Sequence, residues 1–252
     1  MPLPFNMNRM LETELHFPQR FTNMTPKNYG MLFWNEGNKN SHDSNHAVIT
    51  EHLGPEASVR DIEFFYKTKG IRPRIYQSYK SHELEKLRPA LENHGFTIET
   101  TAGQFFLHDH DSTLTAVGEL HIERLRSLSI DVMETIAIEF GGDWTIKVVE
   151  RHMLHPSYHL LGGFVNGDLA SLASVSVYAG YSRVNDVYTR DKYRGHGFAG
   201  AMIDYLVRYH KQLSDNYLYL FSADPSAIRI YQKGGFTPLQ HDYDFWEAWK
   251  EI

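Results

Sequence analysis

The chain of 252 residues is 42% hydrophobic and 13% aromatic, which is enough for a substantial core in one large domain or two smaller ones. Its formal net charge of −6 argues against a nucleic-acid-binding protein, for which a basic surface is expected. The absence of cysteine excludes disulfides, a thiolate nucleophile and a cysteine-ligated zinc site.

No apolar run approaches the length of a membrane-spanning helix, and the first residues lack the charged and apolar regions of a signal peptide. We therefore expect a cytoplasmic protein, with neither a nucleic acid nor a membrane among its partners. The modest acidic balance permits an amine substrate but does not single one out.

Residues 1–112 predict a small α/β domain, because segments with helical periodicity alternate with short runs typical of strands. We expect helices at 8–16, 57–68 and 81–93 and strands at 29–36, 47–53 and 72–78. Residues 101–112 form the expected linker to a second domain at 113–252.

The second domain is predicted to contain a longer series of elements. Asn166-Gly167 is the strongest short signal for a β-hairpin, and Asp131 is the expected N-cap of the first helix. Pro225 fits the first turn of the last helix, and Gly234 caps its end. In chain order we expect a strand at 119–126, helices at 131–140 and 143–153, strands at 158–165, 169–178 and 183–189, a helix after residue 197, a strand within 215–224, a helix at 225–233 and a last strand at 242–246.

A glycine-rich turn, Arg194-Gly-His-Gly197-Phe-Ala199-Gly200, lies between the strand at 183–189 and an amphipathic helix. Glycine allows the backbone to approach a ligand closely and to adopt positive φ. A helix that begins at such a turn presents unpaired N–H groups and the positive end of its dipole, which suit a pyrophosphate. The turn therefore predicts a phosphate-binding loop.

Two further types of phosphate loop share features with this turn. Gly195-x-Gly197-x-x-Gly200 fits the dinucleotide pattern G-x-G-x-x-G, but hairpin-like strands precede it rather than the start of a βαβ unit. A Walker loop needs Gly-Lys-Ser/Thr after the turn, which this sequence lacks. An ordinary strand-to-helix turn is the remaining alternative.

A second string, A-x-x-x-Y-x-x-x-G-F, spans residues 227–236. The pattern R-x-x-G-x-A at 194–199 resembles the acyl-CoA loop of the GNAT superfamily of N-acetyltransferases, and the second string resembles another signature of that superfamily. The two occur in the expected order, and the resemblance covers about residues 113–252. It implies an α/β fold with a mixed α+β sheet, the acyl-CoA N-acyltransferase fold, preceded by the smaller N-terminal α/β domain.

The resemblance implies direct transfer of an acetyl group from acetyl-CoA to a primary amine, without a metal. It implies that Tyr231 protonates the departing thiolate and that Asp186, near the position of a family glutamate, takes the proton of the amine. Glu150 and His152 are alternative bases, and a substrate that loses its proton to solvent needs no base. The residues expected at acetyl-CoA are Val187, Tyr188, Thr189, Arg194, Gly195, His196, Gly197, Phe198, Ala199, Gly200 and Asp224, the last in place of a frequent family asparagine.

The N-terminal part contains echoes of the second string. Tyr66-x-x-x-Gly70-Ile-x-Pro73 has the form of the segment 231–238, and residues 94–97 are similar to 234–237. These echoes indicate a degenerate GNAT-like half, similar to tandem members of the superfamily, although two unrelated helix–turn–strand joins account for them equally well. This half has no acyl-CoA loop, so we expect it to bind no CoA and to shape the acceptor site.

Two other functions stay open. A non-catalytic acyl-CoA-binding or sensor module would keep the loop without the chemistry, whereas an aminoacyl-tRNA-dependent transferase is disfavoured by the CoA-type loop and the acidic charge. The acceptor is expected to be a small-molecule or peptide amine, and a homodimer is left open. The histidine clusters at 108–111 and 152–159 match no metal-site pattern and are interpreted as linker and loop residues.

Overall fold

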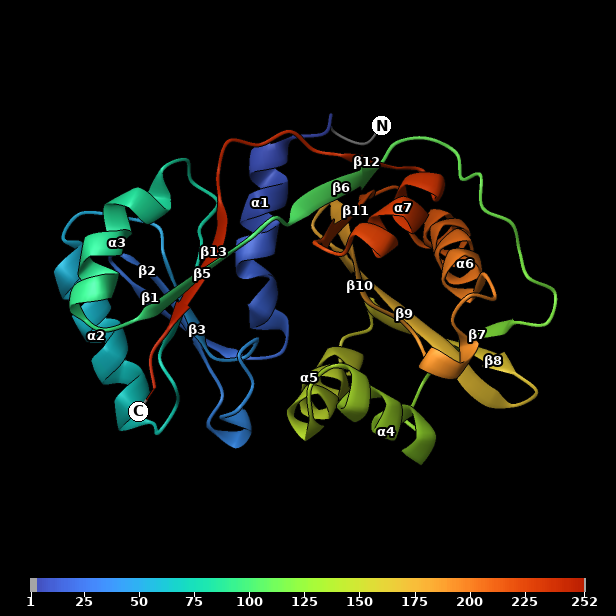
Figure 1. Ribbon diagram of the computed structural model, residues 1–252, viewed down its shortest axis with the longest axis horizontal. Coiled ribbons are helices and arrows are strands. Elements are labelled where there is room, and N and C mark those ends of the chain that lie inside the picture. The colour runs from blue at the N-terminus through green and yellow to red at the C-terminus, as the bar shows by residue number, and fades with distance from the viewer. Residues whose placement is uncertain (1–3, 252) are drawn as a thin grey trace. The chain divides into compact units, whose positions relative to one another are not determined.

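The computed structural model describes residues 4–251 and divides the chain into two compact units (Figure 1). The loop unit, which holds the glycine-rich turn, comprises the N-terminal segment to Thr13 and Gly103–Leu239. The companion unit comprises Glu14–Ala102 and Gln240–Ile252. Each unit thus consists of two separate segments of the chain, which differs from the expected single boundary after residue 112.

The loop unit has a 7-stranded sheet in the order β12-β6-β11-β10-β9-β8-β7. Neighbouring strands are antiparallel except β10 and β11, which are parallel and connected through α6. Helix α1 (Met7–His16) crosses the division between the units. The other elements are β6 (Gln104–His108), β7 (His121–Leu125), α4 (Ile130–Glu139), α5 (Asp143–Met153), β8 (Tyr158–Val165), β9 (Asp168–Tyr178), β10 (Tyr181–Thr189), the 3-10 helix η3 (Asp191–Tyr193), α6 (Phe198–Leu213), β11 (Tyr217–Ser222), α7 (Pro225–Lys233) and β12 (Phe236–Pro238).

Local sequence signals account for several of these elements. Asn166 and Gly167 adopt φ values of 51° and 88°, as the two-residue turn between β8 and β9 requires. The N-cap of α4 is Ser129, whose hydroxyl accepts the N–H of Val132 (3.4 Å). The expected cap, Asp131, was wrong because this residue already lies in the first helical turn, whereas Ser129 has the extended backbone of an N-cap.

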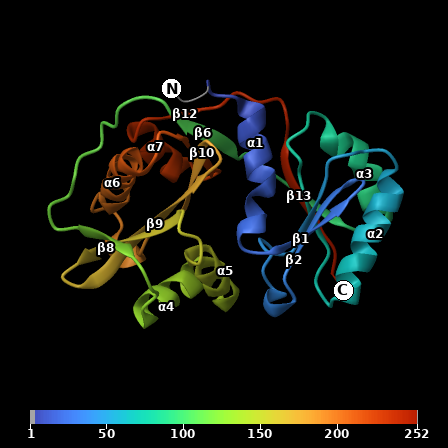
Figure 2. The ribbon, with the colours of Figure 1, turned by 180° about the vertical axis from the view of Figure 1, so that it is seen from behind.

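Helices cover both faces of this sheet (Figure 2). Helices α6 and α7 pack on one face, against side chains such as Val184 and Leu220. Helices α4 and α5 pack on the other, against side chains such as Leu160 and Leu172. Because successive side chains of a strand point to opposite faces, β8 and β9 contribute to both clusters.

The companion unit has a 6-stranded sheet in the order β1-β2-β3-β4-β13-β5, in which only β3 and β4 are parallel. Its elements are the 3-10 helix η1 (Phe17–Arg20), β1 (Asn23–Lys27), β2 (Gly30–Trp34), the 3-10 helix η2 (Glu36–Asn38), β3 (His46–Ile49), α2 (Pro55–Thr68), β4 (Arg74–Tyr76), α3 (Glu83–Asn93), β5 (Thr97–Thr101) and β13 (Phe245–Trp249). Strands β1 and β5 were not expected from the sequence.

The two sheets repeat one topology. In each, three antiparallel strands lead through a helix to a fourth strand parallel to the third, and a second helix leads to an edge strand. Thus β1-β2-β3-α2-β4-α3-β5 corresponds to β8-β9-β10-α6-β11-α7-β12. This correspondence agrees with a GNAT-like N-terminal half.

The last strand of each half is exchanged. Strand β6 follows β5 in the chain but lies between β11 and β12, whereas β13 follows β12 but lies between β4 and β5. The expected linker 101–112 therefore contains a central strand of the loop unit. The expected strand at 242–246 is found at 245–249 in the companion sheet. Hydrophobic alternation predicts a strand but cannot choose its sheet.

The echoes noted in the sequence are only partly equivalent in space. Residues 94–97 and 234–237 both connect the second helix of a half to its edge strand. Tyr66, however, lies on α2, which corresponds to α6, whereas Tyr231 lies on α7. The hydroxyl of Tyr66 is buried and donates to the carbonyl of Phe33 (2.8 Å), so Tyr66 is a core residue.

Candidate active site

The parallel strands β10 and β11 stay paired over only part of their length. Among the described residues, the register pairs Tyr181–Arg183 with Tyr217–Tyr219. Strand β10 continues to Thr189 and β11 to Ser222. We call the parts of β10 and β11 beyond this pairing the strand opening. It lies at the carboxyl ends of parallel strands, where α/β proteins commonly bind ligands.

A β-bulge brings Asp186 to this opening. The register of β10 with β9 shifts between Asn185 and Tyr188, and Asp186 has a left-handed φ of 52°. Its Oδ2 accepts hydrogen bonds from the hydroxyls of Tyr158 (2.7 Å) and Ser174 (2.5 Å). Bulges near active sites commonly redirect a side chain, and here two donors fix the redirected carboxylate.

The environment of Asp186 belongs to the sheet face covered by α4 and α5. Tyr158 is part of the cluster between these helices and the sheet. Burial, followed by the charge of Asp186, raises the pKa of Tyr158 well above its ordinary value, so that it remains a donor. The buried imidazole of His152 stacks on Tyr158, with ring centroids 4.9 Å apart, whereas Glu150 is exposed on α5.

The glycine-rich turn forms the N-terminus of α6. Gly195 and Gly197 have φ values of 82° and 81°, which side chains other than glycine rarely adopt. The N–H of Ala201 donates to the carbonyl of Gly197 (3.0 Å), so the N–H groups of residues 198–200 precede the helical hydrogen-bond ladder. The first turn of α6 carries no acidic residue that would repel an anion.

Arg194 and His196 fold back on the turn. The guanidinium of Arg194 donates from Nε to the carbonyl of Thr189 (3.2 Å), pairs with Asp191 (3.0 Å) and lies 5.7 Å from the ring centre of Tyr188. His196 is exposed and stacks on Phe198, with ring centroids 5.6 Å apart. Arg194 therefore ties the turn to the end of β10.

The last residues of β10 lead directly into this turn. The hydroxyl of Ser171 donates to the carbonyl of Tyr188 (2.6 Å) and lies 3.0 Å from the hydroxyl of Thr189. Burial, followed by the nearby Glu139 carboxylate, raises the pKa of Tyr188 to about 12. Val187 packs against the cluster beneath α6 and α7. Residues 187–189 are thus held between β9 and that cluster.

Tyr231 lies on α7 in the same cluster as Val187 and is 7% exposed. Burial, followed by the charge of Asp224, raises its pKa to about 12, so its hydroxyl is protonated at neutral pH. Asp224 is exposed and is the N-cap of α7, where its Oδ1 accepts the N–H of Ser226 (2.8 Å). The Asp224 side chain thus has a helix-capping role that was not expected from the sequence.

Asp186 and Tyr231 therefore belong to opposite faces of the sheet. The partners of Asp186 lie in the α4–α5 layer, and Tyr231 lies in the α6–α7 layer. In an intact sheet the strands would separate two such groups. Here the pairing of β10 with β11 ends three residues before Asp186, at Arg183, so the strand opening adjoins both layers.

Some residues of this region could not be identified from the sequence. Tyr158, Ser174 and Ser171 lie on strands β8 and β9, far from either string, and only the strand register brings them to β10. Leu114 is a further case, because a Cβ on Gly200 would lie 3.1 Å from its Cδ2. The segment before β7 thus packs on the first turn of α6.

The corresponding position in the companion unit is filled by its own side chains. The carboxylate of Glu83, which is 2% exposed, accepts from the N–H (2.8 Å) and the hydroxyl (2.5 Å) of Ser78 and lies 3.4 Å from Nε2 of His52. Burial raises the pKa of Glu83. Lys80 also donates to the carbonyl of Thr50. These contacts join the segments that follow β3 and β4.

Several histidines lie in regular elements rather than in loops. His108, His152 and His159 lie in β6, α5 and β8, so their assignment to a linker and a loop was wrong. Burial lowers the pKa of His159 to about 4. Among residues 4–251, no group of three or more His, Cys, Asp or Glu could hold a metal ion. Within the same range, every helix is too short or too polar to cross a membrane.

Comparison with solved structures shows the same fold in other proteins. A GCN5-related N-acetyltransferase from Kribbella flavida has a TM-score of 0.68 and 14% identity, over 96% of this chain and 94% of that chain. A functionally unknown conserved protein from Staphylococcus epidermidis has a TM-score of 0.63 and 13% identity, over 90% and 93%. A tandem GNAT protein from the clavulanic acid biosynthesis pathway has a TM-score of 0.54 and 14% identity, over 81% and 74%.

A comparison with curated protein sequences found no match. Residues 129–236, however, match the model of the acetyltransferase (GNAT) family. This range includes the bulged strand β10, the glycine-rich turn and α7. Residues 129–236 therefore match the GNAT acetyltransferase family, within a chain that has the GNAT fold over most of its length.

Proposed function

We propose that the chain is an N-acyltransferase that moves an acetyl group from acetyl-CoA to a primary amine by direct attack. The observation that carries the proposal is the strand opening, which adjoins a phosphate-type loop and two sheet faces that hold a protonated tyrosine and a fixed carboxylate. We further propose a cytoplasmic location and a small-molecule or peptide amine as the acceptor.

The residues of the loop fit the pyrophosphate of acetyl-CoA. A Cβ built on Gly195 meets no atom within 4 Å, so open space lies beside this turn. The N–H groups of residues 198–200 and the helix dipole would bind the pyrophosphate, and Arg194 would orient the turn. The backbone of Val187–Thr189 would bind the pantetheine arm. When bound, acetyl-CoA supplies a thioester as the acyl donor.

Two proton transfers accompany the reaction. Asp186, held by Tyr158 and Ser174, would take a proton from the amine on the α4–α5 side. Tyr231, on the α6–α7 side, would donate its proton to the thiolate that leaves. Each proton transfer of this kind contributes about 10²–10⁴-fold to the rate of an enzyme.

Isothermal titration with acetyl-CoA, CoA and NADH in parallel tests the proposal. Acetyl-CoA and CoA should bind, and Gly197→Glu should abolish this binding, since a charged side chain would enter the anion site at a backbone φ of 81°. A thiol-release assay with a panel of amines would then identify the acceptor. A preference for NADH, or no binding of CoA, would reject the transferase.

A non-catalytic acyl-CoA-binding module is the competing function. Binding and thiol-release measurements on the same purified protein distinguish it from the enzyme. Such a module would bind acetyl-CoA but release no thiol with any amine. For the enzyme, Asp186→Asn should lower turnover while the affinity for acetyl-CoA stays within about twofold, since Asp186 is assigned to the amine.

A further inference from the structure

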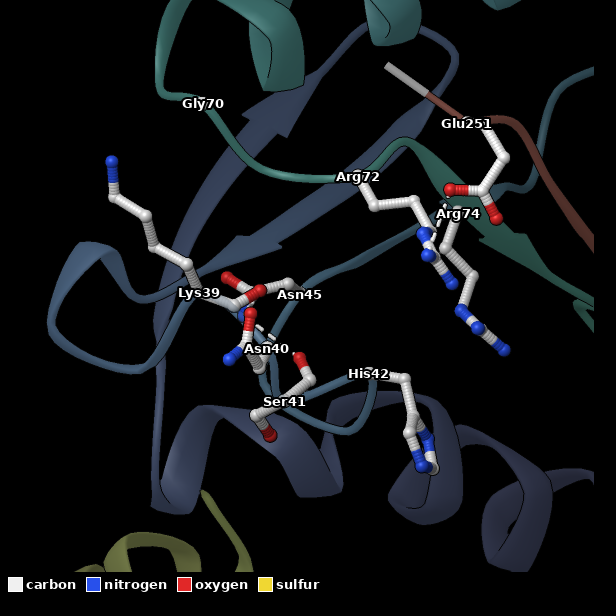
Figure 3. Close-up of a pocket in the computed structure, with 9 residues that line it drawn as sticks. All are labelled: Lys39, Asn40, Ser41, His42, Asn45, Gly70, Arg72, Arg74 and Glu251. Carbon is white, nitrogen blue, oxygen red and sulfur yellow. Dashed lines mark hydrogen bonds and ion pairs between the residues drawn. The ribbon is translucent and has the colours of Figure 1, made fainter. Parts of the chain in front are cut away.

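The companion unit contains a polar cavity of about 410 Å³ (Figure 3). Its walls come from residues 39–45, which connect η2 to β3, from residues 70–74, which lead from α2 into the first residue of β4, and from Glu251. These connections precede β3 and β4. The cavity is therefore at the amino ends of the parallel strands, whereas the position that corresponds to the strand opening is at their carboxyl ends.

The lining of this cavity is cationic, although the chain as a whole is acidic. Lys39, Arg72 and Arg74 contribute three positive charges and Glu251 one negative charge, which gives +2 for the lining against −6 for the chain. Arg72 and Arg74 are two positions apart in the sequence. Their side chains lie next to each other, in the same part of the cavity as His42 (Figure 3). The ammonium of Lys39 points away from them.

Carboxylates orient both guanidinium groups. Arg74 is 14% exposed, donates to Glu247 and lies 5.4 Å from the ring centre of Trp249. Arg72 is 49% exposed and pairs with Glu251 at 2.8 Å. Since a guanidinium carries five N–H donors, one carboxylate contact leaves donors for a second anion.

The opposite wall is held rigidly by buried hydrogen bonds. The side-chain amide of Asn45, which is 2% exposed, donates to the carbonyls of Asn38 (2.8 Å) and Ser41 (2.7 Å) and accepts the N–H of Asn35 (2.7 Å). The hydroxyl of Ser41 lies 2.9 Å from that of Ser44. This wall keeps its shape without a ligand, which lowers the ordering cost of binding.

We propose that this cavity binds the phosphate group of a small phosphomonoester. Such a group carries a charge of about −1.5 to −2 at pH 7, opposite in sign to the lining, whose +2 becomes +1 when Glu247, the partner of Arg74, is counted. The planar forks of Arg72 and Arg74 suit its oxygens, and the exposed side-chain amide of Asn40 in the facing wall supplies a further donor. The volume lies in the range of sites for small molecules.

The test measures binding to the full chain by isothermal titration with inorganic phosphate, glycerol 3-phosphate and succinate at constant ionic strength. Both phosphate compounds should bind more tightly than succinate. Arg72→Gln should weaken binding of glycerol 3-phosphate by about tenfold or more, because it removes a charge-assisted hydrogen bond. Glu251→Gln should strengthen binding several-fold, because it removes a competing carboxylate.

Arg60→Gln is the matched control, since it removes the same charge from an exposed position of the same unit outside the cavity. It should leave the affinity unchanged. Equal loss in Arg60→Gln and Arg72→Gln would show a general charge effect and overturn the proposal. If Gly197→Glu lost phosphate binding while Arg72→Gln kept it, the phosphate site would be the loop at α6, and the proposal for the cavity would be overturned. Tighter binding of succinate would refute the phosphate assignment.

Discussion

The exchange of β6 into the loop unit predicts that one residue of the expected linker is essential to the stability of this unit. Phe106 is 1% exposed and pairs with Leu220 on one side and Pro238 on the other. It also belongs to the hydrophobic cluster that contains Tyr231 and Phe236. We therefore expect Phe106→Ala to destabilise the part of the chain that carries the proposed site.

The magnitude follows from the burial of this side chain. Replacing a buried phenylalanine with alanine costs about 3–5 kcal/mol, because the transfer free energy is lost and a cavity remains. With a urea m-value of about 2 kcal/mol/M, the midpoint of unfolding should fall by roughly 1.5–2.5 M. Phe64→Ala is the matched control, since Phe64 is 68% exposed and its truncation should change stability by less than about 0.5 kcal/mol.

Urea unfolding gives the stability, and hydrogen exchange read by mass spectrometry locates the loss. Exchange in Phe106→Ala should increase in β11 and β12, the neighbours of β6. An unchanged midpoint would refute the reasoning about burial. Faster exchange confined to β5, which precedes β6 in the chain, would show that β6 belongs to the companion sheet and refute the strand exchange.

Three further predictions concern the proposed site and the response to pH. Tyr231→Phe should lower kcat by about 10²–10⁴-fold with little change in the affinity for acetyl-CoA; an equal loss of affinity, measured by titration, would assign the tyrosine to packing alone. Tyr158→Phe should lower kcat through the loss of a donor to Asp186, whereas the control Tyr178→Phe, at a tyrosine that is 42% exposed, should not. Equal kcat values for these two variants would exclude Tyr158 as a positioning residue. Burial lowers the pKa of His46 to about 4, so the unfolded chain takes up the proton first and stability should fall as the pH drops from about 6.5 to 4. For this group the free energy of unfolding should change by about 1.4 kcal/mol per pH unit. In His46→Gln, urea unfolding measured across this pH range should show a pH dependence that is smaller by that amount.

The proposed cofactor residues were accessible from the sequence because most of them are consecutive. Residues 187–200 form one strand end, one turn and one helix start, so their mutual geometry is set locally. Glycine at 195 and 197 was expected because the turn needs positive φ, and both residues have it. The assignment of these residues to acetyl-CoA stays a prediction.

The surroundings of Asp186 were not accessible in this way. Tyr158 and Ser174 reach its carboxylate only through the pairing of β8 with β9 and of β9 with β10. The bulge that turns Asp186 toward them has no local signal, since an aspartate with φ of 52° is uncommon outside turns. His152 likewise joined this group through ring stacking on Tyr158, which a helix pattern does not reveal.

By itself, the sequence determined the fold class, most of the helices, the hairpin at Asn166-Gly167 and the position of the glycine loop. These features depend on propensities, turn chemistry and periodicity, which act over a few residues. Only the tertiary structure decided that β6 and β13 are exchanged, that the α4–α5 and α6–α7 layers both adjoin the strand opening, and that Arg72 and Arg74 line a cavity with residues 39–45. Strand order and side-chain clusters depend on pairing between distant segments, and a short strand such as Gln104–His108 fits several sheets until the whole core is packed.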